Sequence, residues 1–332
     1  MDVPDGVSHG HRMGEATVKI LITGAAGFLG RNFVKFHVER GDVVHGIDDM
    51  SSPHAQWITG WPNNQVGDAA EFFDVWSDGT INDYDVVYHF AAPVGGREKI
   101  ENDPLFNADS LRLDASLFRW AAKHGQSATI VYPSSSAVYG TALQRSDVAR
   151  PLREPDFDPS HPNWPAPDEI YGLSKMVGEV LAWKAEKYGV NTLCIRPFSG
   201  YGEDQSLEYP IPSICRRVAK RENPLMVWGS GQQSRDFIHV DDIVRVTVAR
   251  IESGVYKYQP MNIGTGEFHT FNQIAHMAAS VQDDYHPSIE NLLDKPQGVD
   301  RRVCDPTHML NYYTPRVSLP EGLKRAVEAN WT

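Results

Sequence analysis

The chain has 332 residues, 41% of them apolar, so it is long enough for one large domain or two medium ones around a sizeable core. Thirty-one Lys and Arg residues stand against 43 Asp and Glu, a formal net charge of −12 that argues against a nucleic-acid partner. The sequence has no apolar run long enough to span a membrane, no cysteine pattern typical of disulfides or zinc among its 3 cysteines, and no histidine pair at metal-ligand spacing, so we expect a cytoplasmic protein without a metal.

The first half of the chain alternates segments with strand and helix patterns. Apolar and β-branched runs predict strands, which fall at 17–23, 43–47, 84–90, 128–132 and 191–196. Apolar residues at helical spacing predict helices over 28–40, 105–124 and 168–188, the first of them ending at Gly41. Such alternation forms right-handed βαβ units, so we predict an α/β fold with a doubly wound, Rossmann-type parallel sheet.

The remaining segments lack this alternation. Residues 1–16 carry no apolar stretch of the kind a signal peptide needs and are expected to form a flexible extension. Six prolines between 140 and 167 exclude a helix or a central strand there and predict a long ordered loop or lid. After Pro197 the pattern fades, so 199–332 is predicted to form a smaller mixed α/β lobe.

A glycine-rich turn joins the first predicted strand to the first predicted helix. It has the form G-x-x-G-x-x-G, beginning at Gly24. Gly24 would allow the tight turn, Gly27 would let the backbone approach a pyrophosphate, and Gly30 would let the helix lie close to the sheet. With the amides of Phe28 and Leu29 at the positive end of the helix, this turn predicts a dinucleotide site.

Acidic residues after the turn indicate which dinucleotide is bound. Asp48 ends the second strand, where a carboxylate accepts hydrogen bonds from ribose hydroxyls and repels a 2′-phosphate. No Lys or Arg stands in the four residues that follow it, which favours NAD over NADP. Asp68 resembles the adenine contact of such sites, and Ala91 and Ala92 end a strand where the cofactor would lie.

Tyr171 and Lys175 stand four residues apart, on one face of a predicted helix. A neighbouring ammonium favours the phenolate and lowers the pKa of a tyrosine, which could then act as general base and acid on a sugar or alcohol hydroxyl. Because the Y-x-x-x-K pattern is common by chance, it gains weight from the stretch Ser134-Ser-Ser-Ala-Val-Tyr-Gly140, which follows a predicted strand upstream.

These features and several later motifs together resemble the extended short-chain dehydrogenases/reductases, in the nucleotide-sugar epimerase/dehydratase group. The resemblance covers Lys19 to Ala326, and overall it extends to the GDP-mannose 3,5-epimerases. The later motifs are Ile195-Arg-Pro-Phe-Ser-Gly-Tyr-Gly202, Arg235-Asp-Phe-Ile-His-Val-Asp-Asp242, Asn262-Ile-Gly-Thr-Gly266 and Pro296-Gln-Gly-Val-Asp-Arg-Arg302.

The resemblance implies roles for particular residues. Ser135 would be the catalytic hydroxyl, Tyr171 the base and Lys175 its partner, with Pro197 packed beside the nicotinamide. The substrate, a nucleotide-diphosphate sugar, would contact a set of six residues: Gly95, Gly96, Ser136, Ser199, Arg235 and Arg302. Of these, the two arginines would hold the diphosphate, which suits a bidentate guanidinium.

The resemblance also implies an organisation of the chain. Residues 17–198, with 236–265 returning to them, would form the NAD-binding domain, and 199–332 the nucleotide-sugar lobe. A homodimer is expected through the helices predicted at 105–124 and 168–188.

Departures from the family pattern narrow the reaction. Dehydratases and decarboxylases carry a glutamate, the dehydratases also an aspartate, where this chain has Ser136 and Ala137, and the 3,5-epimerases have a cysteine at Ala137. What remains is oxidation and re-reduction at one carbon, so we expect a 4-epimerase of an NDP-hexose, favouring a UDP-sugar and passing through a 4-keto sugar. Ser199 replaces the usual asparagine and 109–114 lacks the N-V-x-G-T motif, which leaves the identity of the sugar open.

Two other functions stay open on the sequence alone. A dehydratase or a 4-ketoreductase could use the same scaffold, the dehydratase with an acid/base supplied from residues 95–98. A non-catalytic NAD-binding sensor is the alternative from another class, although such proteins commonly lose the tyrosine or the lysine, and here both are present.

Overall fold

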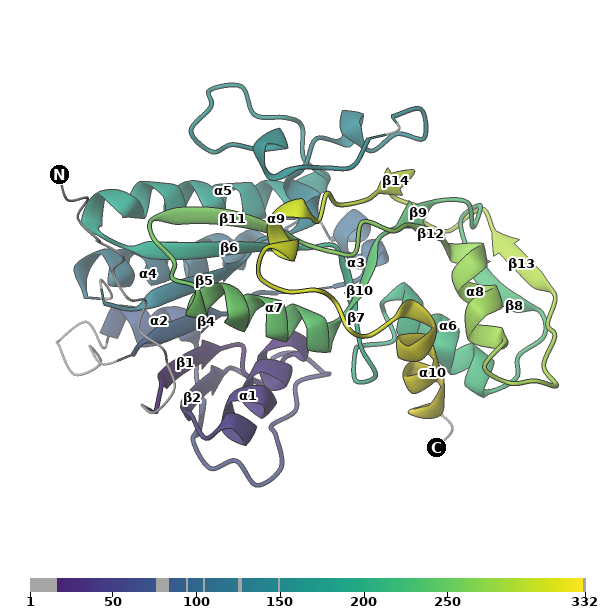
Figure 1. The fold of residues 1–332 in the computed structure, drawn as a ribbon, viewed down its shortest axis with the longest axis horizontal. Coiled ribbons are helices and arrows are strands. Elements are labelled where there is room, and N and C mark those ends of the chain that lie inside the picture. Colours follow the sequence, from purple (N-terminus) through teal and green to yellow (C-terminus); the bar gives the residue numbers. More distant parts are fainter. Residues whose placement is uncertain are drawn as a thin grey trace, which may run out of the picture.

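A computed structural model describes residues 17–75, 84–93, 95–103, 105–124, 127–148 and 150–330. Its centre is a sheet of seven parallel strands in the order β11-β6-β5-β4-β1-β2-β3 (Figure 1). The strands are β1 (Lys19–Thr23), β2 (Val43–Asp48), β3 (Asn64–Val66), β4 (Val86–His89), β5 (Thr129–Pro133), β6 (Asn191–Pro197) and β11 (Tyr258–Ile263). Chain order reverses between β1 and β4, which is where doubly wound sheets bind ligands.

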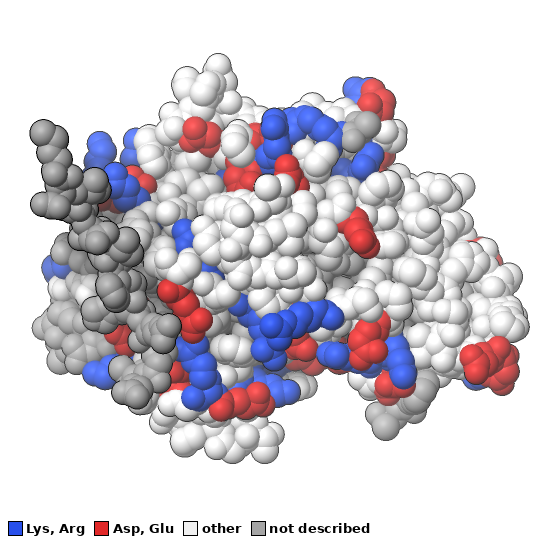
Figure 2. Space-filling view, in the orientation of Figure 1, with Lys and Arg blue, Asp and Glu red and all other residues white. Residues whose placement is uncertain are grey.

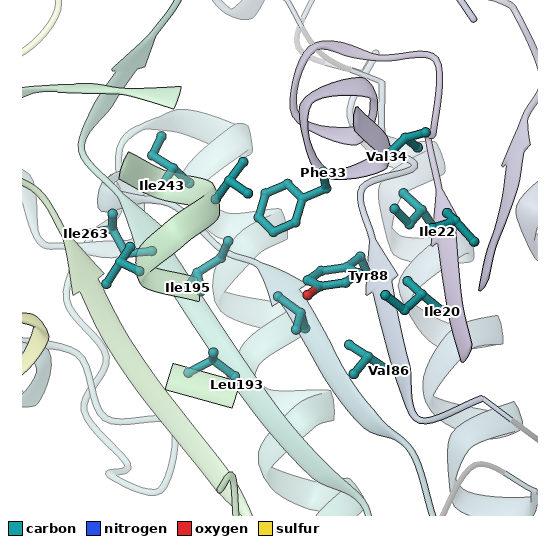
Figure 3. Close-up of a cluster of buried hydrophobic side chains, with 14 of the residues drawn as sticks. Ile20, Ile22, Phe33, Val34, Val86, Tyr88, Leu193, Ile195, Ile243 and Ile263 are labelled. Atoms are coloured by element: carbon teal, nitrogen blue, oxygen red, sulfur yellow. The ribbon is translucent and has the colours of Figure 1, made fainter. Parts of the chain in front are cut away.

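Helices cover both faces of this sheet (Figure 1). On one face lie α1 (Phe28–Arg40) and α7 (Val240–Glu252), and on the other α2 (Ala69–Val75), α4 (Ala108–Lys123) and α5 (Glu169–Ala185). Figure 3 shows the core under α1 and α7, where Phe33 and Ile243 from the helices meet Ile20, Tyr88 and Ile195 from the strands. Because both faces are buried, the central strands β1 and β4 read as nearly continuous apolar runs rather than alternating ones.

The rest of the chain forms a second, smaller core beside the carboxyl ends of the strands (Figure 1). Three helices and a two-stranded sheet build it: α6 (Pro210–Ala219), α8 (Phe271–Ala279), α10 (Leu319–Glu328), β8 (Leu225–Trp228) and β13 (Ile289–Leu292). Short elements connect the two cores: α3 (Arg97–Asn102), β7 (Ser199–Tyr201), β9 (Ser234–Arg235), β10 (Phe237–His239), β12 (His269–Thr270), β14 (Arg301–Arg302) and α9 (Thr307–Leu310).

The α/β class and the doubly wound parallel sheet are confirmed. The helix predicted over 28–40 has those bounds, and Gly41 ends it in the left-handed conformation at φ 88°. The segment 140–167 forms no long helix or strand in its described part, only short 3-10 turns at Thr141–Leu143 and Glu154–Asp156. The predicted extension at 1–16 lies outside the described residues.

The division at residue 198 stays a prediction. Within the stretch 236–265 that was expected to return to the NAD-binding domain, α7 covers the large sheet and β11 forms its edge beside β6. The remaining lobe, 199–332, contributes the second core.

Charges on the surface are mixed in sign. On the face shown in Figure 2, Lys and Arg side chains lie beside Asp and Glu rather than in one continuous field. None of the helices in the part of the chain that the structure describes is long and apolar enough to cross a membrane.

Acid should destabilise the protein through His37, a 2% exposed side chain of α1. Its Nδ1 lies 2.7 Å from Asp42 Oδ2 and its Nε2 lies 2.9 Å from the Tyr88 hydroxyl. Burial lowers the pKa of His37 from 6.5 to about 4. The unfolded chain therefore takes up a proton at a higher pH than the folded protein, so stability is lost as the pH falls from 6.5 towards 4.

Between pH 6.5 and pH 5 this one group should cost about 2 kcal/mol of unfolding free energy. Urea unfolding of wild type and His37→Gln at pH 7 and pH 5 measures the effect. The loss on acidification should be smaller in the variant, and equal losses would contradict the assignment.

Candidate active site

The glycine turn lies at the switch point of the sheet, between β1 and β4. Gly24 has φ +67°, and a Cβ there would stand 2.5 Å from the carbonyl carbon of Phe90, just past β4. A Cβ at Gly30 would stand 2.0 Å from the Gly24 oxygen. Both positions therefore require glycine, since any side chain would push the turn away from the strand or the helix away from the turn.

The first turn of α1 leaves donors open. Gly27 is the N-cap, has no side chain to cap with, and the first turn carries no acidic residue. Among the described residues the amides of Phe28 and Leu29 have no backbone acceptor. Free amides and the positive end of the helix dipole suit a pyrophosphate, so this part of the chain fits a dinucleotide.

Asp48 ties the end of β2 to the glycine turn. Its Oδ2 accepts a 3.0 Å hydrogen bond from the Ala26 amide and its Oδ1 a 2.9 Å bond from the Met50 amide. Burial raises the pKa of this carboxyl, and these backbone donors oppose the shift. The carboxylate is thus held at the rim of the turn, beside the place where a ribose would follow the pyrophosphate.

The other expected cofactor residues lie around the same edge. Asp68 caps α2 by accepting from the amides of Ala70 and Glu71, and it pairs with Arg112. Ala91 and Ala92 follow β4, the amide of Ala91 lying 3.3 Å from Thr23 Oγ1. The Asp68 carboxylate thus already binds the start of α2 and Arg112, and its recognition of adenine stays a prediction.

A segment of the second half, 202–209, lies across the glycine turn. Arg31 of α1 pairs with the carboxylate of Asp204 and also donates to its carbonyl, and Arg31 Nη1 donates to Ala26 O over 3.2 Å. A Cβ at Gly202 would stand 3.2 Å from the ring of Phe28. The segment therefore lies against the first turn of α1, next to the place where a dinucleotide would lie.

Two elements bring the expected catalytic residues together. Ser135 follows β5, where its Oγ accepts a 3.1 Å bond from the Ala137 amide, and α5 carries Tyr171 and Lys175. The two elements touch at Gly172, where a Cβ would stand 2.4 Å from Ala137 O. The turn that carries Ser135 therefore packs against the first turns of α5, the helix that carries Tyr171 and Lys175.

Lys175 is 4% exposed, with Nζ 5.3 Å from the centre of the Tyr132 ring. Among the described residues no carboxylate pairs with it. An almost buried ammonium without a counter-ion is typical of a group that awaits a polar ligand.

A buried ion pair fixes the same helix further along. Glu179, one turn beyond Lys175, accepts from Arg196 Nε at 2.8 Å and from Nη2 at 2.7 Å, and both side chains are fully buried. Arg196 also donates to the carbonyls of Glu154 and Phe157, in the proline-rich segment. Sequence reasoning missed this pair, because a lone glutamate and a lone arginine far apart in the chain give no spacing signal.

The two arginines expected at the diphosphate lie together with a third. Arg302 Nη2 lies 2.7 Å from Asp168 Oδ2, Arg97 Nη1 lies 2.8 Å from Asp168 Oδ1, and Arg235 donates to the carbonyls of Ser234 and Gln297. Sequence reasoning missed Arg97 and Asp168. The only sign in the sequence is that Arg97 directly follows the pair Gly95-Gly96, which was expected at the substrate.

The remaining expected substrate and cofactor residues border this region. Gly96 caps α3, and a Cβ there would stand 2.4 Å from Glu208 O, while Gly95 packs on Lys99. Ser136 is buried beside Ser135, and Pro197 and Ser199 are half-buried where β6 ends and β7 begins. In the described residues no group of three His, Cys, Asp or Glu side chains is arranged to hold a metal.

The clasp between Arg31 and Asp204 should slow release of a bound dinucleotide. Arg31→Gln or Asp204→Asn removes the charge pair that holds 202–209 over the turn, so NAD should dissociate about fivefold faster. The measurement is the NAD content of the purified protein after timed dialysis. Arg40→Gln, on the same helix but paired with Asp42 and Glu252, is the matched control. Equal retention by all four proteins would refute the clasp.

Comparison with known proteins identifies the family. The model of the NAD dependent epimerase/dehydratase family matches residues 20–264. The chain is 30% identical to a dTDP-4-dehydro-6-deoxy-D-allose reductase of a Streptomyces species, covering 79% of this chain and 80% of the relative, and 27% identical to the UDP-glucose 4-epimerase of Mycolicibacterium smegmatis, covering 94% and 98%. The crystal structure of the Thermotoga maritima UDP-glucose 4-epimerase with UDP-glucose matches with a TM-score of 0.78 and 25% identity, over 94% of this chain and 98% of that one. With its glycine turn, open helix end and Asp48 all fitting a dinucleotide, the chain belongs to the NAD dependent epimerase/dehydratase family and uses NAD as its cofactor.

Proposed function

We propose that this enzyme acts on nucleotide sugars and inverts C4 of an NDP-hexose through a transient 4-keto sugar. The observation that carries the proposal is the close packing of the turn after β5, which holds Ser135 and the buried Ser136 and Ala137, against the start of α5, which carries Tyr171 and Lys175. A hydroxyl, a phenol and an ammonium suffice to move one proton. The two neighbouring positions hold no carboxylate that could remove a second proton from the sugar.

The residues divide the proton chemistry between them. Tyr171 accepts the proton of the 4-hydroxyl, Ser135 donates a hydrogen bond to the same oxygen, and Lys175 stands one turn from Tyr171 on the same face of α5. The chemistry that bound NAD supplies is acceptance and return of the C4 hydride. After the keto sugar has turned about its diphosphate, Tyr171 returns the proton, so the protein ends each cycle unchanged.

The substrate would be held at its diphosphate. Arg235 and Arg302 present guanidinium groups beside α3, and Gly95, Gly96 and Ser199 border the space for the sugar. We favour a UDP-sugar because both named 4-epimerase relatives act on UDP-glucose. Although the net charge of the whole chain is −12, these guanidinium groups supply positive charge at the place where the diphosphate would lie.

A 4-ketoreductase is the second candidate, and one observation favours it. The reductase relative from Streptomyces is 30% identical to this chain, so reduction of a keto sugar occurs among its relatives. A dehydratase would need an acid/base from 95–98, and a non-catalytic sensor would have no use for an intact tyrosine and lysine.

A product assay separates these functions. The purified protein is incubated in D2O with a panel of UDP-, dTDP-, GDP- and CDP-sugars, and products are followed by NMR. A 4-epimerase should interconvert C4 epimers without added cofactor and without deuterium at C3 or C5, and it should release NAD when denatured. Net consumption of NADH or NADPH would indicate the reductase, and deuterium with a dehydrated product would indicate the dehydratase.

Tyr171→Phe removes the proposed base and separates loss of the proton transfer from loss of cofactor binding. Turnover should fall by about 10²–10⁴, the range for a general acid–base group, while NAD content stays that of wild type. Unchanged turnover would exclude Tyr171 as the base, and activity on no sugar of the panel would refute the 4-epimerase.

We also propose a homodimer through α4 and α5. These helices pack side by side and expose apolar side chains, among them Leu111 and Leu173, each about 40% exposed. Light scattering at micromolar concentration should give twice the mass of one chain, and Leu173→Glu should shift the equilibrium to the monomer. A wild-type monomer would contradict the proposal.

A further inference from the structure

Asp168 uses its side chain in an unexpected way. It is the N-cap of α5, a position where aspartate normally accepts hydrogen bonds from the first amides of its own helix. Here the side chain makes no capping bond and instead bridges Arg97 and Arg302 at 2.8 and 2.7 Å. Burial alone would raise the pKa of Asp168, but the charges of Arg302 and Arg97 outweigh it and hold that pKa below its usual range.

Two of the three guanidinium groups around Asp168 form ion pairs in the described residues, and the third, Arg235, has carboxylates of Asp168 and Asp300 near it without an ion pair. Arg97 pairs with Asp168 and Glu101, and Arg302 pairs with Asp168, but among the described residues no carboxylate pairs with Arg235. Burial and the positive charges of Arg302 and Arg97 lower the pKa of Arg235 to about 9. A guanidinium still carries its charge at neutral pH, so the site holds a cation that an added anion would stabilise.

The backbone beside Asp168 links this cluster to the proposed base. Glu169 follows at φ +57°, a conformation that costs free energy for any residue except glycine. Tyr171 is at the third position of α5, so its amide is one that an N-cap side chain normally binds. Movement of the Asp168 carboxylate therefore acts on the helix turn that carries Tyr171.

We propose that Asp168 occupies the place of the substrate's diphosphate when no substrate is bound, and that Arg97 is a third guanidinium of the diphosphate site. On binding, the phosphate oxygens take over Arg97 and Arg302 beside Arg235, and the released carboxylate caps α5 at Ile170 and Tyr171. This rests on the proposed function only in that the ligand is a nucleoside-diphosphate sugar. Asp168 is a positioning residue, and it couples diphosphate binding to the placement of Tyr171.

If Asp168 competes with the diphosphate, removing its charge should strengthen UDP binding, whereas a purely structural role predicts weaker or unchanged binding. Asp168→Asn keeps the size of the side chain and its ability to cap a helix, but removes the charge that competes with phosphate. The variant should bind UDP about tenfold more tightly than wild type, and its KM for the sugar nucleotide should fall while kcat does not rise. Without ligand it should unfold at a lower temperature, because the guanidinium groups lose their shared counter-ion.

The test is calorimetric titration of the NAD-containing protein with UDP, together with thermal unfolding with and without UDP. Glu169→Gln is the matched control, because Glu169 directly follows Asp168, carries the same charge and is exposed. The UDP affinity of this variant should equal that of wild type. Arg97→Gln should weaken UDP binding about tenfold. Asp168→Ser, another good N-cap, replaces Asp168→Asn if that variant does not fold.

UDP binding to Asp168→Asn that is equal to or weaker than wild type would show that Asp168 only orders the arginines, and would overturn the proposal. Absence of UDP binding to wild type would overturn it as well. The sugar assay is read separately. If wild type turns over no sugar but Asp168→Asn binds UDP more tightly than wild type, only the 4-epimerase proposal is refuted. If wild type is a 4-epimerase but Asp168→Asn binds UDP no more tightly, only the competition between Asp168 and the diphosphate is refuted.

Discussion

The ion pair of Glu179 and Arg196 is the interaction on which the site depends. Both side chains are fully excluded from solvent, and every oxygen of the carboxylate is bonded to Arg196, Ser134 or Tyr258. Removing one partner of such a pair leaves a bare buried charge and costs about 3–5 kcal/mol. Because Glu179 belongs to α5 and Arg196 to β6, the pair joins the helix that carries Tyr171 to the strand beside the sheet's edge strand β11.

The same helix is held by charge at its other end. Asp168 lies against Arg97 and Arg302, which belong to α3 and β14, so three separate parts of the chain meet where α5 begins. Tyr171 and Lys175 stand between these two anchors. The Glu179–Arg196 pair is closed to solvent and to ligands. The arginines around Asp168 can still bind an anion, so α5 is held rigidly at one end and can adjust at the end that faces the second lobe.

The sequence predicts most of the large sheet well, because the patterns that define its turns, helices and strands lie within a few consecutive residues. The glycine turn, α1 and five of the seven strands of the large sheet (β1, β2, β4, β5 and β6) follow from turn chemistry and apolar spacing within a few residues, and the structure confirms the class and the sheet. The strand β3 and the helices α2 and α3 are only 3 to 7 residues long, too short for a periodic signal. Roles assigned through the family resemblance, such as those of Ser135 and Arg235, stay predictions.

The missed parts of the site share one physical cause. The missed residues, Arg97 and Asp168, lie far apart in the chain from each other and from Arg302, which was expected at the site, and single charged residues in a chain usually lie on a solvated surface. Only the packing of α3 and β14 against the start of α5 reveals that these charges are partly buried together. Long-range charge clusters of this kind leave no trace in composition or spacing.

The position of β11 at the edge of the sheet determines when the sheet can be completed during synthesis of the chain. β6 ends at Pro197, but the strand that pairs with it begins only at Tyr258, after the segment that lies over the glycine turn, the helices α6 and α7 and much of the second lobe. During synthesis the amides and carbonyls along one side of the apolar strand β6 have no partner until that late strand leaves the ribosome. The nascent chain thus carries an open sheet edge for the time it takes to make those residues.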